Sequence, residues 1–244
     1  MFLKVLGSSS QGNCYILEND TSTLIIEAGV SFREVKKAIG FNVRKIGGVL
    51  ISHEHLDHAR YIKDYLQAGI PVYSAFQTQT ALEIITGELT KAIPPMKEVQ
   101  IGEFLIIPFN VPHDAEIECY GYLVEHKEMG KLLFLTDLEY CKYNFSKQNI
   151  NHILVEANYS HKLIDNEAVN FEHILRGHMS LQTALDFIAI NDNPMLRNIV
   201  LMHLSDKNGN PVEFLQETRE TVKYGANCYI AQKGLEVNLS LCPF

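Results

Sequence analysis

Residues 52–60 constrain this 244-residue chain more than any other stretch. They read SHEHLDHAR and place three histidines and two acids within nine positions, directly after the apolar run GGVLI. That run predicts a buried strand, and the end of a strand fixes a side chain while the adjoining loop leaves it open to solvent and ligands. Three interpretations are open: a chance cluster, a charged helix start with Asp57 in its first turn, and a metal site.

The spacing H-x-H-x-D-H is formed by His53, His55, Asp57 and His58. Imidazole nitrogens and carboxylate oxygens are ligands that Zn²⁺ and similar ions accept. Four such groups within six residues are too crowded for one regular element to direct at a single ion, whereas a strand-to-loop turn can present them to two ions. A polar helix start needs no histidines, so the pattern favours a metal site.

The same arrangement, an apolar strand followed by a histidine or an acid, recurs later in the chain. The runs IIPFNVP, LLFLT, ILV and IVLM are followed by His113, Asp137, Glu156 and His203. Each of these four residues alone would be interpreted as a polar loop residue, but together they predict side chains that converge at one edge of a sheet. Four more histidines have no motif around them and are interpreted as surface or loop residues: His126, His152, His161 and His173.

Short apolar strands occur along the whole chain and alternate with two groups of helices. Helices are expected at 31–40, 59–69, 75–87, 179–192 and 210–225. Ser31 and Asn210 are the expected N-caps of the first and the last of these helices. A sandwich of sheets with helices on the outside buries all the apolar faces, so we expect a four-layer α/β fold over residues 1–244 as one domain.

Charge, cysteines and the N-terminus narrow the class of protein. The 29 acids and 21 bases argue against a protein that coats nucleic acid broadly, although divalent cations would offset acids gathered in one site. The five cysteines contain no C-x-x-C pair, which fits a reducing cytosol better than a disulfide framework. Lys4 interrupts the apolar N-terminus, so we expect a first strand, a cytoplasmic protein and no membrane partner. The oligomeric state stays open.

The H-x-H-x-D-H pattern after a buried strand resembles the hallmark of the metallo-β-lactamase superfamily. The resemblance covers nearly the whole chain, because the later positions appear in the family's order. It implies an αββα sandwich with two divalent ions at one edge, Zn²⁺ as the first choice and Mn²⁺ or Fe²⁺ as alternatives. It also implies the ligands: His53, His55 and His113 for the first ion, Asp57, His58 and His203 for the second, and Asp137 as the bridge.

Two further blocks resemble particular branches of this superfamily. The opening GSSSQGNCYIL is similar to a loop of the YycJ (WalJ) group, cytosolic metal-dependent nucleases that act on DNA. The segments VEANYS, GHMSLQTALDFI and IVLMHLS are similar to ribonuclease Z, in which a strand-end Glu pairs with the His of an H-x-[ST] motif; these are Glu156 and His178 here. The resemblance implies phosphodiester hydrolysis, with Asp57 orienting the water that attacks phosphorus. His178, polarised by Glu156, protonates the leaving oxygen or binds the phosphate, or else it caps the helix that begins near Ser180.

The loop at the N-terminus and one cation supply candidate substrate contacts. Ser8, Ser10 and Asn13 lie in a Gly-flanked loop that can hold a phosphate or support the metal loop, or be only a tight polar turn. Arg60 stands where the family usually has Gly and adds a cation near the site. Glu27 stands where the family usually has Asp, so the hydrogen bonding behind the metal loop is expected to differ.

These features lead to two candidate activities and one non-enzymatic alternative. The first is a DNA exonuclease, with DNA favoured over RNA as the partner. The second is a small-molecule or cyclic-nucleotide phosphodiesterase of the same fold, which the compact chain favours. A binding module with a structural metal is disfavoured, because structural zinc sites are closed by four ligands and seven candidates are present here.

Overall fold

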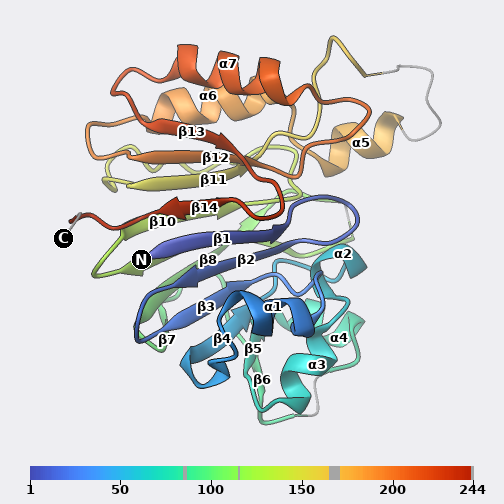
Figure 1. The fold of residues 1–244 in the computed structure, drawn as a ribbon. Coiled ribbons are helices and arrows are strands. Elements are labelled where there is room, and N and C mark those ends of the chain that lie inside the picture. The colour runs from blue at the N-terminus through green and yellow to red at the C-terminus, as the bar shows by residue number, and fades with distance from the viewer. Residues whose placement is uncertain (85–86, 115, 165–170, 243–244) are drawn as a thin grey trace.

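The computed structural model describes residues 1–84, 87–114, 116–164 and 171–242, and its strands form two seven-stranded sheets (Figure 1). The first sheet has the order β14 (Glu236–Asn238), β1 (Phe2–Gly7), β2 (Cys14–Glu18), β3 (Thr23–Ile26), β4 (Ile46–Leu50), β5 (Val72–Ser74) and β6 (Thr90–Ala92). The second has the order β13 (Asn227–Ile230), β12 (Asn198–Met202), β11 (His152–Glu156), β10 (Gly130–Leu135), β9 (Cys119–His126), β8 (Phe104–Val111) and β7 (Val99–Ile101).

The helices lie outside the two sheets (Figure 1). Their bounds are α1 (Phe32–Ala38), α2 (Leu56–Ala59), α3 (Ile62–Gln67), α4 (Phe76–Ala81), α5 (Phe171–Gly177), α6 (Leu181–Asn191) and α7 (Pro211–Thr221), with a short 3₁₀ turn at Val43–Lys45. Helices α1 and α3 pack on the first sheet, and α6 and α7 on the second. The four-layer α/β sandwich expected from the sequence is therefore confirmed.

Three apolar clusters hold the layers together. The central cluster draws side chains from both sheets, and the Tyr15 ring of β2 meets the Phe134 ring of β10 edge to face at 5.2 Å. Each outer cluster joins one sheet to its helices. Strands β2, β3, β11 and β12 are buried along their whole length because they are covered on both faces.

Strand direction explains why the predicted polar side chains meet. Strands β10, β11 and β12 run parallel to one another, and β8 has the same direction because it is antiparallel to β9, which is antiparallel to β10. Their carboxyl ends therefore share one edge of the second sheet. The end of β4 in the first sheet is joined to that edge, since Tyr120 N donates to Ser52 O at 3.1 Å.

Most predicted elements are confirmed, with differences where a helix was expected to be longer. The helix expected over 75–87 ends at Ala81, because Glu83 has the left-handed φ of 55°; residues 85–86 lie outside the described part. The helix expected over 59–69 is shorter: α2 ends at Ala59, and α3 covers only Ile62–Gln67. Asn210 caps α7 by accepting from Val212 N, whereas Ser31 stands at the N-cap of α1 without a side-chain hydrogen bond.

Strands β6 and β7 and helix α5 had no sequence signal strong enough to predict. Both strands have only three residues, which leaves no room for an alternating pattern. No helix among the described residues is long and apolar enough to cross a bilayer.

His152 was expected at the surface, but it is fully buried at the start of β11. Its Nε2–H donates to Met129 O and Leu239 O, both at 3.0 Å, and its Nδ1 accepts from the Asn198 amide at 3.0 Å. This arrangement fits the neutral ring. Burial lowers the pKa of His152 to about 4, against the donated backbone hydrogen bonds.

Acid should therefore destabilise the fold through His152. The unfolded chain takes up this proton below about pH 6.5 and the folded chain only near pH 4, so stability is lost as the pH falls between these values. A lowering from 6.5 to about 4 corresponds to roughly 3 kcal/mol. Urea unfolding at pH 7 and pH 4.5 should show a smaller loss in His152→Gln than in the wild type. An equal loss in both proteins would contradict this assignment.

Candidate active site

The H-x-H-x-D-H loop begins where β4 ends and is held by the backbone of two neighbouring loops. His53 follows the strand, His55 is the N-cap of α2, and α2 carries Asp57. The Asp57 carbonyl accepts from Asn13 N at 2.7 Å. A β-carbon on Gly29 would overlap that same carbonyl oxygen, so the close approach requires glycine at this position.

The structure brings together all seven side chains that the sequence predicts as metal ligands. Two groups each have ligand atoms within 4.8 Å of one another: His53, His55, His113 and Asp137, and then Asp57, His58, Asp137 and His203. A third group of the same kind contains Asp137, Glu156, His178 and His203. Asp137 belongs to all three, which is the arrangement expected of a bridging carboxylate.

The donor set suits divalent metal ions. The ring nitrogens His53 Nε2 and His203 Nε2 are buried, and neither has a hydrogen-bond partner among the described residues. Buried polar atoms without a partner are costly and rare, so each calls for an explanation such as a bound ion. Imidazole nitrogens and carboxylate oxygens are the ligands of Zn²⁺ and related ions. The residues present therefore fit a pair of divalent ions.

Hydrogen bonds on the far side of the rings orient two of these histidines. Ser52 Oγ lies 2.8 Å from His53 Nδ1, and the Gly177 carbonyl accepts from His113 Nδ1 at 2.9 Å. Because a carbonyl can only accept, His113 carries its hydrogen on Nδ1 and presents the Nε2 lone pair to the cluster.

The cluster concentrates negative charge in the interior. Burial by itself would raise the pKa of Asp137, but His203 and His58 hold it well below its usual value. Burial would likewise lower the pKa of His203, but mainly the carboxylate of Asp137, with Asp57 and Glu156, raises it to about 10. By contrast, burial and neighbouring His58 lower the pKa of His53 well below its usual value, which keeps its ring neutral. The carboxylates thus require nearby positive charge, which protons or divalent cations can supply.

His203 has the left-handed backbone conformation, φ 53°, and its peptide groups are fixed on both sides. Its N–H donates to Ser8 Oγ at 2.9 Å, and its carbonyl accepts from the Asn158 amide at 2.8 Å. Ser8 Oγ also accepts from the buried Tyr15 hydroxyl at 2.8 Å. A side chain outside glycine rarely adopts this φ, so these contacts stabilise a backbone that aims the ring at the cluster.

Glu156 connects His178 to the cluster. Its Oε1 lies 2.8 Å from His178 Nδ1 and 3.0 Å from His203 Nδ1. Its Oε2 accepts from Leu138 N and Met179 N, so the carboxylate is fully buried and fixed. Burial would lower the pKa of His178, but Glu156 raises it above its usual value.

The interpretation of His178 as a helix cap is wrong. Ser180 is the N-cap of α6, and its hydroxyl accepts from Thr183 N at 3.1 Å. His178 is instead engaged with Glu156 at the cluster.

The four candidate substrate contacts fall into two pairs. Ser8 and Asn13 support the cluster, since Asn13 Nδ2 donates to Asp57 Oδ2 at 3.1 Å and is fully buried. Ser10 and Arg60 are exposed, and Arg60 Nη1 donates to the Gln11 carbonyl at 3.3 Å. Their contact with a substrate stays a prediction.

Glu27 lies behind the metal loop, as its position in the sequence implied. Its Oε2 is 3.4 Å from His58 Nδ1, and its Oε1 accepts from Ser52 N at 3.3 Å. Burial raises the pKa of Glu27, although His58 and Ser52 act against this. The longer acid thus contacts both the ring and the backbone of the loop.

Sequence reasoning missed three groups that orient the cluster. Asn158 lies two residues after Glu156 at a strand end, so its position offered a signal. Ser52 directly precedes His53 and offered a similar one. The carbonyl of Gly177 could not be found, because a backbone atom leaves no trace in residue type.

The chain matches the family described as a beta-lactamase superfamily domain over residues 22–204. It therefore belongs to the metallo-β-lactamase superfamily, and this family together with the His/Asp cluster identifies a metal-dependent hydrolase.

Two relatives found by sequence comparison are described by a particular activity. The chain is 30% identical over 149 residues to the exodeoxyribonuclease YycJ of Bacillus anthracis, a match that covers 57% of this chain and 55% of that protein. It is 25% identical over 222 residues to the exodeoxyribonuclease WalJ of Streptococcus pneumoniae serotype 2 strain D39, covering 84% and 81%. The chain thus spans about half of YycJ and most of WalJ.

Solved structures agree on the fold. The metallo-β-lactamase fold protein YhfI of Bacillus subtilis has a TM-score of 0.74 at 18% identity, covering 97% of this chain and 98% of that one. The short form of human tRNase Z has a TM-score of 0.68 at 15% identity, covering 99% and 100%.

The hydrogen bonds that hold the backbone of His203 lead to a prediction about metal affinity. Ser8→Ala removes the acceptor for His203 N–H, so the affinity for one ion should fall about 10- to 100-fold, the usual cost of losing such a support. Competition with a fluorescent zinc chelator would measure it, with Ser10→Ala in the same loop as the control. Equal affinities in the two variants would contradict the role given to Ser8.

Proposed function

We propose that this protein is a two-metal phosphodiester hydrolase that acts on nucleic acid, in the first place a DNA exonuclease. The observation that carries the proposal is Glu156, which contacts His178 and His203 at once and so joins a proton donor to the ligand cluster. Support also comes from the relatives YycJ and WalJ, both described as exodeoxyribonucleases. A cytoplasmic location fits this substrate.

Two divalent cations would be held by the two ligand groups that share Asp137. When bound, such ions supply charge neutralisation of phosphate oxygens and a water that loses its proton near neutral pH. Zn²⁺ is the first candidate for this nitrogen-rich set, with Mn²⁺ or Fe²⁺ as alternatives.

The side chains of the chain itself supply positioning and proton transfer. Asp57 lies at the more exposed side of the cluster, and Asn13 holds one of its oxygens, so Asp57 can orient the attacking water. His178 is mostly buried beside Glu156, which raises its pKa and favours the protonated ring. A protonated His178 can give its proton to the departing sugar oxygen.

His178 should affect turnover without affecting metal binding. His178→Ala should lower kcat about 100- to 10,000-fold, the usual contribution of general acid catalysis. Metal content by atomic emission should stay at the wild-type level. His161→Ala, an exposed histidine, is the matched control. A parallel loss of metal would make His178 a ligand or a support residue instead.

Asp57 should be required for hydrolysis. Asp57→Ala should abolish phosphodiesterase turnover while the circular dichroism spectrum stays unchanged, because Asp57 both faces the metal pair and orients the nucleophile. Residual activity close to wild type would overturn the proposed mechanism.

The substrate can be assigned with 5′- and 3′-labelled single- and double-stranded DNA, the same strands as RNA, and bis(p-nitrophenyl) phosphate. We expect stepwise shortening of DNA and weaker action on RNA. Cleavage of the small ester alone would instead favour the small-molecule phosphodiesterase that the compact chain suggests.

A further inference from the structure

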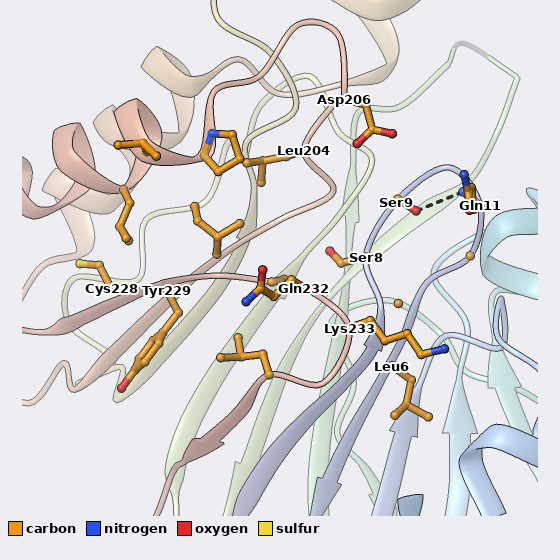
Figure 2. Close-up of a pocket in the computed structure, with 18 of the residues that line it drawn as sticks. Leu6, Ser8, Ser9, Gln11, Leu204, Asp206, Cys228, Tyr229, Gln232 and Lys233 are labelled. Atoms are coloured by element: carbon orange, nitrogen blue, oxygen red, sulfur yellow. Dashed lines mark hydrogen bonds between the residues drawn. The ribbon is translucent and has the colours of Figure 1, made fainter. Parts of the chain in front are cut away.

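A groove of about 1240 Å³ lies between α7, β13 and the loop that follows β1 (Figure 2). Its walls come from residues 6–9, 11 and 12, from one side of α7, and from β13 with the turn that follows it. We call it the α7 groove. Figure 2 shows Tyr229 toward one end and Ser9, Gln11 and Asp206 toward the other.

The α7 groove begins at the backbone that carries His203. Leu204, the next residue along the chain, lines it, and so does Ser8, whose hydroxyl accepts from His203 N. A ligand in the groove would therefore adjoin the backbone that positions His203 without replacing any of the candidate metal ligands.

The chemistry of the walls is mixed. Val212, with 78% of its surface exposed, Leu215 and Tyr229 offer apolar and aromatic surface. Arg219 and Lys233 are exposed, and no described carboxylate lies within 4.0 Å of either of them.

Other charges near the groove are already engaged or lie at its edge. Lys162 is bound to Glu213 and Glu217 on α7, at 3.0 and 3.1 Å. Glu220 in the groove accepts from the Gln216 amide at 2.9 Å, a neutral group that does not cancel its charge. Asp206 is the remaining acid of the lining, and it lies near Ser9 at the end next to the loop (Figure 2). Arg219 and Lys233 are thus the cations available to an anionic ligand.

The volume of the α7 groove and the chemistry of its walls together indicate what kind of ligand it binds. Pockets for single small ligands measure about 300–1,000 Å³, and this groove is larger. Unpaired cations beside aromatic and apolar surface are how proteins hold single strands, with phosphates on the cations and bases against the rings. We propose that the α7 groove holds a few nucleotides of single-stranded nucleic acid adjacent to the bond that is cleaved. This inference rests on the proposed nuclease function.

The test compares a strand that fills the groove with a substrate too small to reach it. In Arg219→Ala/Lys233→Ala, the ratio of kcat/KM for a single-stranded 12-mer to that for bis(p-nitrophenyl) phosphate should fall at least tenfold. The slope of log KM against log salt concentration should also decrease by about 1.4, because each phosphate contact of a single strand contributes about 0.7 to this slope. The control is Lys63→Ala/Lys91→Ala, which removes two exposed cations of α3 and β6 at the other end of the first sheet.

A second variant tests the groove without removing a cation. Val212→Glu puts a negative charge on an exposed position in the first turn of α7, where acids are compatible with the helix. It should lower the same ratio. If the wild type cleaves oligonucleotides and both variants keep its ratio and salt dependence, the groove assignment is overturned. If the wild type cleaves no oligonucleotide, the nuclease function itself fails.

Discussion

The carboxylate of Asp137 is the group around which the site is arranged. Its oxygens lie 3.3 Å from His58 Nε2, 3.4 Å from His203 Nδ1 and 3.8 Å from His53 Nε2. Removing a charge from water is costly unless opposite charge or hydrogen bonds replace the lost solvation. Asp137 is almost fully buried, so the lost solvation of its carboxylate must be replaced. The histidines around it, and the ions that they fit, supply the compensating charge.

That condition explains why so much of the fold ends at one place. Four strands of the second sheet and one of the first bring their carboxyl ends together here. The loop after β4 supplies four of the groups, and β8, β10, β11 and β12 supply one each: His113, Asp137, Glu156 and His203. Strand ends on a packed sandwich are rigid, so the sheets set the positions of the side chains that directly follow a strand. Asp57 and His58 lie instead on α2, whose backbone is held by Asn13 N. Groups in the loops then orient individual ligands. Ser52 and the Gly177 carbonyl hold the rings of His53 and His113, and Asn158 holds the backbone of His203.

The sequence predicted the sandwich and the cluster because both rest on local patterns. Apolar runs ending in His or an acid are visible in residue order, and the family's order of ligands joined them into two sets.

The features that the sequence did not predict depend on contacts between distant segments. His152 has no motif because its partners, two carbonyls and an amide, come from segments distant in the sequence. Ser8 looked like a substrate contact, and only the folded chain shows its hydroxyl beneath His203. Short elements such as β6 and β7 were missed because three residues are too few for a period to appear.

The contact between Ser8 and His203 spans 195 positions of the chain. The second ligand group therefore cannot reach its final geometry until the C-terminal third has folded against the first strand. During synthesis on the ribosome, all four members of the first ligand group are added before His203, although the Gly177 carbonyl that orients His113 is added only after Asp137. His203 is thus the last member of the cluster to be synthesised, and its position requires that two distant parts of the chain have come together.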